Sequence, residues 1–92
     1  MILVELYSRD DCHLCEIAKE VLIGVQRRHP FELNELKIRE GDEYFEEMKE
    51  RIPVVYINKE FAFQGHVPER ELIAKLKTHR DIDPRARNSK NS

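Results

Sequence analysis

Residues 2–15 read ILVELYSRDDCHLC, an apolar run that leads through a polar turn to two cysteines. The run mixes β-branched and aromatic residues, which predicts a largely buried strand over residues 2–7 and a turn over residues 8–11. Cys12 and Cys15 are spaced so that both sulfurs fit on one helical turn and can close a disulfide without backbone movement. Because a bridge around so small a loop contributes little to stability, reversible redox chemistry is the first candidate explanation.

After the cysteines, apolar residues recur at helical spacing and end in a basic segment before Pro30, which predicts a helix. Its inward stripe is expected to comprise Leu14, Ile17, Ala18, Val21, Leu22 and Val25. At the start of this helix, free backbone N–H groups and the positive end of the helix dipole would favour a thiolate at Cys12. We therefore expect Cys12 to be the nucleophile and Cys15, shielded beside Leu14 and Ile17, to be the resolving thiol.

The middle of the chain predicts one strand and one short helix. The strand is expected over residues 31–38, where the apolar alternation slips at Asn34 and Glu35 and indicates a bulge or an early end. Helical spacing then resumes after Asp42, which is a plausible N-cap. This helix has to stop before Pro53.

A hairpin and a last helix complete the pattern. Residues 54–57 and 61–63 read as its two strands, and Pro68 suits the first turn of the helix. The resulting order predicts an α/β protein with a four-stranded mixed sheet and three helices, which is the layout of the thioredoxin fold. We expect this domain to span residues 1–80. Residues 81–92 are expected to be a disordered tail, because beyond Pro84 they offer almost no apolar side chain to pack.

Composition limits the classes of partner and compartment. The 92 residues are enough for one small domain, and the 16 basic and 18 acidic residues nearly cancel at a net charge of -2. No whole-molecule field therefore favours nucleic acid or an anionic membrane. The sequence shows neither a signal-peptide pattern nor a membrane-length apolar stretch. Together with the single close cysteine pair, this predicts a cytoplasmic protein. We expect a monomer with no nucleic-acid or membrane partner.

Two segments resemble the glutaredoxin family. Residues 4–15 resemble its first strand and active-site turn, and residues 51–57 resemble its segment around a cis-proline. The Cys-His-Leu-Cys form, in place of the usual Cys-Pro-Tyr-Cys, resembles a divergent glutaredoxin-like branch. The resemblance implies a thiol-disulfide oxidoreductase that acts through Cys12 and Cys15 on protein or glutathione disulfides. It also implies glutathione as a co-substrate and no bound cofactor.

The same resemblance implies four substrate-binding residues. The peptide bond before Pro53 would be cis, and the backbone of Ile52 would pair with a bound peptide or glutathione. Arg9 takes the place of a lysine that glutaredoxins commonly use near the glutathione carboxylate. Gly65 occupies a turn where glutaredoxins carry two glycines followed by an acidic residue, and here Glu69 is the displaced acid.

Two other interpretations of the cysteine pair remain open at this point. The cysteines could be ordinary buried residues that happen to be close. Alternatively, the protein could be a non-catalytic thioredoxin-like binding module that holds a protein partner, a zinc ion or an iron–sulfur cluster, with His66 as a further ligand. Zinc usually needs four protein ligands, or three and a water. The chain offers two cysteines and four histidines, and two of these, His29 and His79, lie at expected helix ends away from the cysteine pair. We therefore expect no metal ligands in this chain.

Overall fold

The computed structural model describes residues 1–43 and 45–81. Its elements follow the predicted order. They are β1 Leu3–Ser8, α1 His13–Arg28, β2 Glu32–Lys37, α2 Phe45–Met48, β3 Val54–Ile57, β4 Glu60–Gln64 and α3 Glu69–Asp81. Beyond Asp81, where α3 ends, the predicted tail lies outside the described residues.

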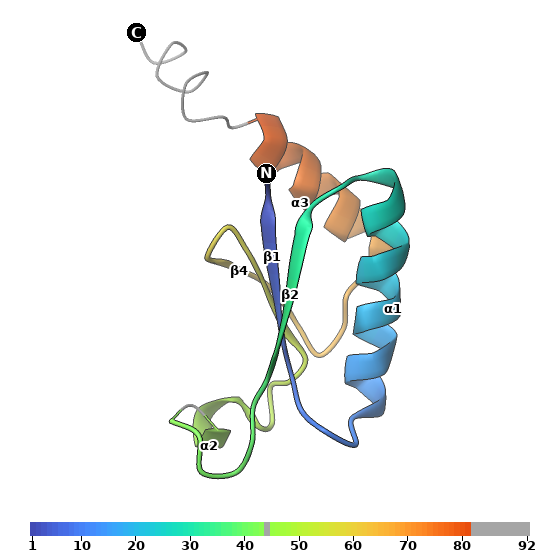
Figure 1. Ribbon diagram of the computed structural model, residues 1–92. Helices are drawn as coiled ribbons and strands as arrows, with labels where there is room; N and C mark the ends of the chain where they lie inside the picture. Colours follow the sequence, from blue (N-terminus) through green and yellow to red (C-terminus); the bar gives the residue numbers. More distant parts are fainter. Residues whose placement is uncertain (44, 82–92) are drawn as a thin grey trace, which may run out of the picture.

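The four strands form one mixed sheet in the order β2-β1-β3-β4. β1 runs parallel to β2 and antiparallel to β3, and β3 and β4 form the antiparallel hairpin. The helices α1 and α3 lie on one side of the sheet, and the short α2 lies at the end where β1 and β2 finish (Figure 1). The predicted architecture of a four-stranded mixed sheet with three helices is therefore confirmed.

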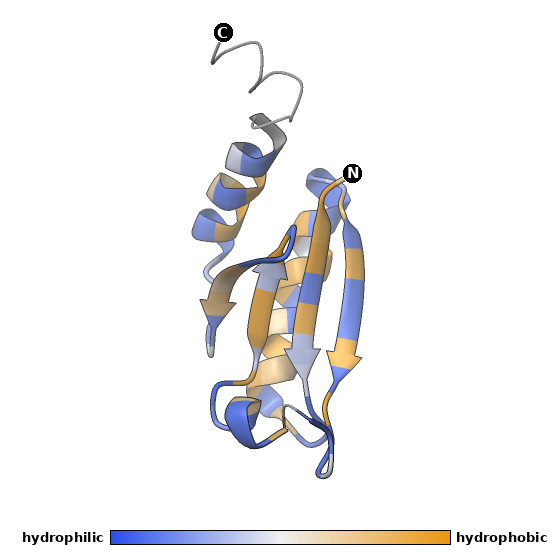
Figure 2. Cartoon of the chain, turned by 90° about the vertical axis from the view of Figure 1, so that its left-hand side faces the viewer, coloured by the Kyte–Doolittle hydropathy of each residue, from blue (hydrophilic) through white to orange (hydrophobic). Residues whose placement is uncertain are grey.

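The main core lies between the sheet and the two longer helices. Its fully buried members are aliphatic, namely Val4, Leu6, Leu22, Val25, Val55, Ile57 and Leu72. Burial of one such side chain contributes about 1.5–3 kcal/mol. The hydropathy colouring of Figure 2 shows β3 largely orange and the edge strand β2 with more blue, because β3 is mostly buried and β2 mostly exposed.

The helix α1 buries most of the predicted stripe: Ala18, Leu22 and Val25 are buried and Val21 packs partly buried against the core, but the first two predicted positions are not buried. Leu14 and Ile17 are 54% and 39% exposed, whereas the buried residues are Cys15, Ala18, Leu22 and Val25. These four positions are spaced by three or four residues and so share one face of the helix. Because Cys15 is turned toward the sheet, helical periodicity places Leu14 and Ile17 outside. The prediction that these two residues shield Cys15 is therefore wrong.

The edge strand β2 is regular along its full length. It pairs with β1 in an unbroken parallel register that ends with Lys37 opposite Ser8. The bulge or early end predicted at Asn34 and Glu35 is therefore wrong. An apolar alternation is enforced only where one face of a strand is buried, and β2 is largely exposed.

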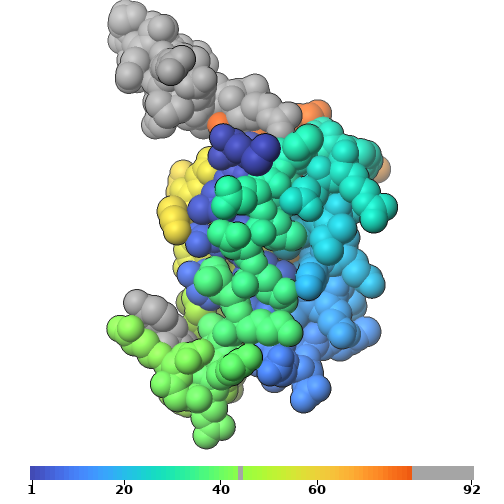
Figure 3. Space-filling view, viewed as in Figure 1, coloured from blue at the N-terminus to red at the C-terminus, as the bar shows by residue number. Residues whose placement is uncertain are grey.

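The segment after β2 turns back before α2 begins. Asp42 Oδ2 accepts a hydrogen bond from the backbone N–H of Arg39 at 2.6 Å, and its carbonyl accepts one from Phe45 at 3.1 Å. The side chain expected to cap α2 therefore closes the preceding turn instead. In the space-filling view this green segment lies at the same end of the molecule as the start of α1 (Figure 3).

Within the described ranges, none of the helices combines the length and the apolar character needed to cross a membrane.

Candidate active site

Cys12 is the N-cap residue of α1. Its backbone is extended, with φ -122° and ψ 102°, and its carbonyl accepts a hydrogen bond from the N–H of Glu16 at 3.2 Å. Its Sγ accepts a hydrogen bond from the N–H of Cys15 at 3.2 Å. The sulfur thus takes the position that a side-chain oxygen occupies in an ordinary N-cap. One cysteine of the pair therefore lies on the free N–H groups at the positive end of the helix.

A disulfide joins Cys12 and Cys15, whose Cα atoms lie 5.2 Å apart. The prediction that the pair can close on one helical turn is confirmed. The two residues are 8% and 4% exposed. On one side they pack with Ile38, Ile52 and Val54, which we call the apolar cluster. This cluster gives Cys15 the shielding that sequence reasoning assigned to Leu14 and Ile17.

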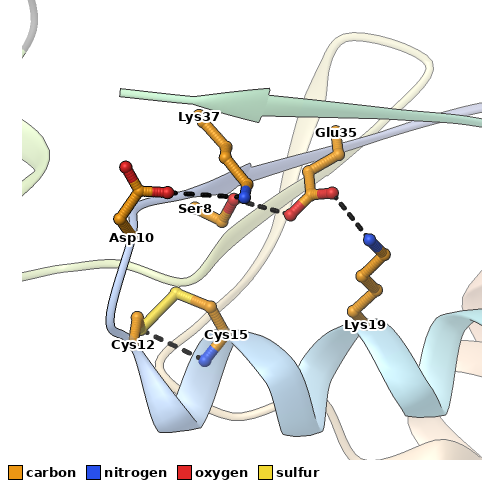
Figure 4. Close-up of polar contacts among 7 residues, drawn as sticks. All are labelled: Ser8, Asp10, Cys12, Cys15, Lys19, Glu35 and Lys37. Atoms are coloured by element: carbon orange, nitrogen blue, oxygen red, sulfur yellow. Dashed lines mark hydrogen bonds and ion pairs between the residues drawn. A yellow bond between two sulfur atoms is a disulfide. The ribbon is translucent and has the colours of Figure 1, made fainter. Parts of the chain in front are cut away.

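On its other side the disulfide borders a polar cluster, formed by Ser8, Lys19, Glu35 and Lys37. The Ser8 hydroxyl donates to Glu35 Oε2 at 2.9 Å, and Lys19 Nζ donates to Glu35 Oε1 at 2.9 Å. Lys37 Nζ donates to Asp10 Oδ1 in the turn before Cys12 at 3.4 Å. Figure 4 shows the disulfide and Lys19 on the side of α1 that faces these strand residues. The contacts connect β1, β2 and α1 beside the cysteines.

Glu35 has a lowered pKa within this cluster. The hydrogen bond from Lys19 is the largest cause, and burial opposes it by raising the pKa of the carboxyl group. The hydrogen bond from Ser8 and the positive charges of Lys19 and Lys37 lower the pKa further. The ionised form of Glu35 is therefore favoured over the protonated form, and it holds the ammonium group of Lys19.

Three members of the polar cluster, Lys19, Glu35 and Lys37, line a common cleft of about 180 Å³ with the cysteines. Its walls come from the turn before α1, from the first two turns of that helix and from β2. They consist of Arg9, Asp10, Asp11, Cys12, Cys15, Glu16, Lys19, Glu35 and Lys37. The predicted substrate residue Arg9 therefore lies exposed on the same cleft as the disulfide.

The other predicted substrate residues meet around Pro53. The peptide bond between Ile52 and Pro53 is cis, as the resemblance implied. Ile52 packs with the cysteines in the apolar cluster, and its N–H donates to the carbonyl of Met48 at 3.0 Å. The Ile52 N–H is therefore already hydrogen-bonded within the chain. Gly65 has a φ of 75° and donates its N–H to the carbonyl of Pro53 at 2.7 Å.

His66, which was considered as a metal ligand, and His13 between the cysteines are both at the surface. His13 is exposed and lies 3.8 Å from the carboxylate of Glu16, and His66 is exposed in the loop before α3. Residues 1–43 and 45–81 contain no group of three or more His, Cys, Asp or Glu side chains placed to hold a metal ion.

Sequence reasoning missed the polar cluster. Two local signals pointed toward it. Lys19 follows Cys15 by four residues and so lies on the same face of α1. Glu35 and Lys37 alternate along β2 and therefore share one face of the strand. Their meeting with Ser8 depends on the parallel register of β1 and β2.

Known proteins resemble this chain in sequence and in fold. A curated relative, the "Glutaredoxin-like protein YDR286C homolog" of Dictyostelium discoideum, is 29% identical over 81 residues, covering 82% of this chain and 75% of the relative. The solution structure of protein Ne2328 from Nitrosomonas europaea matches with a TM-score of 0.68 at 22% identity, covering 80% of this chain and 89% of that one.

Glutaredoxin 1 of Francisella tularensis, solved in complex with cacodylate, matches with a TM-score of 0.53 at 18% identity, covering 88% of this chain and 99% of that one. At such identities the two structures show the thioredoxin-like fold alone. Residues 3–77 match the family described as Glutaredoxin-like domain (DUF836). The match to this family, together with the disulfide between the two cysteines of the Cys-x-x-Cys pair, suggests a redox-type function. The chain belongs to the glutaredoxin-like domain family.

Proposed function

We propose that this protein is a thiol-disulfide oxidoreductase that uses Cys12 as the nucleophile and Cys15 as the resolving thiol. The observation that carries the proposal is the position of Cys12 Sγ at the N-cap of α1, where it accepts the N–H of Cys15 at 3.2 Å. Backbone donors and the helix dipole at this position favour a thiolate, which is the nucleophile in disulfide exchange.

The proposed exchange proceeds in two displacements. In the first, the Cys12 thiolate attacks a substrate disulfide, forms a mixed disulfide and releases one substrate thiolate. In the second, the Cys15 thiolate attacks Cys12 Sγ, closes the Cys12–Cys15 disulfide and releases the other substrate thiolate. Both released thiolates take up protons according to their own acidity. The protein pair is thereby oxidised by two electrons, and the substrate disulfide is reduced to two thiols.

Trapping of the mixed disulfide tests this assignment. A Cys15→Ser variant cannot complete the second displacement, so a disulfide substrate should leave a stable adduct on Cys12, which peptide mass spectrometry locates. The matched Cys12→Ser variant should form its adduct much more slowly, because Cys12, not Cys15, holds the N-cap position that favours a thiolate. Adduct formation at neither cysteine, or at equal rates in the two variants, contradicts the mechanism.

As substrates we propose protein disulfides or glutathione disulfide, with glutathione as the reductant and with Arg9, Ile52, Pro53 and Gly65 on the substrate side. The support is the position of Arg9 on the cleft of the disulfide and the packing of Ile52 against the cysteines. Equilibration of the pair with glutathione and with thioredoxin as separate reductants tests this choice. We further propose that the protein acts as a monomer in the cytoplasm, without a bound cofactor.

A further inference from the structure

Lys19 lies one helical turn after Cys15, on the same face of α1. Residues four apart on a helix have Cβ atoms about 5 to 6 Å from each other. Both side chains line the cleft of about 180 Å³, and both lie on the side of α1 that faces β1 and β2 (Figure 4). In the disulfide form, the Lys19 ammonium group is held by Glu35 Oε1 at 2.9 Å.

Charged residues from several elements line the cleft that Cys15 also lines. Those that line the cleft are Arg9, Asp10 and Asp11 from the turn, Glu16 and Lys19 from α1, and Glu35 and Lys37 from β2. Tyr7 of β1 and Tyr56 of β3 pack against the apolar cluster that contains Cys15.

Of the cations that line the cleft, Lys19 is the one that α1 carries one helical turn after Cys15. Its partner Glu35 is held by a hydrogen bond from the hydroxyl of Ser8, a residue that is only 1% exposed. Lys37 is instead paired with Asp10, whose side chain is 62% exposed, so solvent screens that pair more strongly.

Resting on the proposed function, we propose that Lys19 is a positioning residue for the second displacement: its ammonium group stabilises the thiolate that forms on Cys15. Glu35 competes with this thiolate for Lys19. In the disulfide form Cys15 carries no charge, and Lys19 is paired with Glu35. When Cys15 ionises, a negative charge forms in a site that is 4% exposed, where burial alone opposes it. The ammonium group can then be shared between the carboxylate and the thiolate.

The electron and proton balance of this step is simple. Cys15 starts as a thiol beside a mixed disulfide on Cys12, and it loses its proton to water. The thiolate attacks Cys12 Sγ, the bond between Cys12 and the substrate sulfur breaks, and the substrate thiolate leaves with the electron pair. Lys19 keeps its proton throughout and acts only through its charge.

The experiment mixes the reduced protein with dipyridyl disulfide in a stopped-flow spectrophotometer. The first pyridinethione is released when Cys12 attacks, and the second is released when Cys15 resolves the adduct. The rate of the second release is measured across the range in which thiols ionise, about pH 6 to 10. Lys19→Met should move the midpoint of this profile to higher pH. It should also slow the second release about three- to tenfold at neutral pH, because a thiol with a higher pKa has a smaller thiolate fraction there.

Matched variants should change the midpoint of the pH profile in opposite directions. Glu35→Gln removes the competing carboxylate, so the midpoint should move to lower pH and the second release should become faster at neutral pH. Lys19→Arg should restore the original profile. Lys77→Gln, at an exposed position on α3, is the control, and its pH profile should match that of the unaltered protein. At alkaline pH, where Cys15 is ionised in every variant, Lys19→Met should be at least as fast as the unaltered protein.

Some results would overturn the assignment of Lys19. They are an unchanged midpoint in Lys19→Met, equal slowing at every pH, or midpoint changes in the same direction for Lys19→Met and Glu35→Gln. The last two are expected if the ion pair only holds α1 against β2. Failure of the proposed function looks different, because the Cys12→Ser and Cys15→Ser variants would then release their single pyridinethione at equal rates.

Discussion

The two sides of the disulfide differ in chemistry. On one side lies the apolar cluster of Ile38, Ile52 and Val54, and on the other the polar cluster that contains Ser8, Lys19 and Glu35. Apolar side chains exclude water but offer no group that stabilises a charge. Paired ionic groups can change partners and stabilise a charge that forms nearby. Substitutions on the apolar side should therefore act mainly on stability, and substitutions on the polar side mainly on the ionisation of the cysteines.

The largest expected effect on stability lies on the apolar side. Ile38→Ala removes most of a buried side chain beside the cysteines and should lower the free energy of unfolding by about 2 to 5 kcal/mol. Ile23→Ala, at an exposed position on α1, is the control and should change it by less than about 1 kcal/mol. Urea unfolding followed by circular dichroism measures both values. Similar losses in the two variants would show that Ile38 does not belong to a packed cluster.

An intermediate effect on stability is expected for Ser8 of β1, which belongs to the polar cluster. Ser8→Ala removes the buried hydroxyl that donates to Glu35 Oε2 at 2.9 Å and should lower the free energy of unfolding by about 1 to 2 kcal/mol. The control is Thr78→Ala, whose hydroxyl donates to the carbonyl of Ala74 on the exposed side of α3 and should have little effect. If the Ser8→Ala variant is as stable as the unaltered protein, Ser8 does not anchor the polar cluster.

The smallest expected effect is the response of the polar cluster to acid. The pKa of Glu35 is lowered in the folded protein, chiefly by the hydrogen bond from Lys19. The stability that this group contributes is therefore fully present above the pKa of the unfolded chain and is lost as the pH falls through the folded pKa. From neutral pH to about pH 3, the unaltered protein should lose more stability than Glu35→Gln. Parallel losses in acid unfolding curves would contradict the lowered pKa.

Much of the fold could be predicted because it depends on local patterns. The apolar run before Cys12, the helical spacing after it and the paired runs around Asn58 each specify an element within a short window. The turn residues Asn58 and Lys59 have φ values of 49° and 70°, as a two-residue hairpin turn with positive φ at both positions requires. Such elements depend little on what packs against them, and their order leaves few topologies open.

The predicted part of the candidate site was also local. Cys12 and Cys15 lie three residues apart at the strand-to-helix turn, so short-range geometry already brought their sulfurs together. The cis bond at Pro53 came from the resemblance to glutaredoxins, and the structure confirms it. By contrast, the roles of Arg9, Ile52 and Gly65 in binding a substrate stay predictions.

Spacing along short stretches of chain was enough to specify the order of the elements and the position of the cysteine pair. The buried stripe of α1 and the surroundings of the disulfide depended on tertiary packing instead. Helical periodicity allowed Leu14 and Ile17 to face inward, but the packing of Cys15 against the sheet turned them outward. Ser8 and Glu35, 27 residues apart, meet only through the register of two parallel strands, and such long-range pairing leaves no local pattern to read.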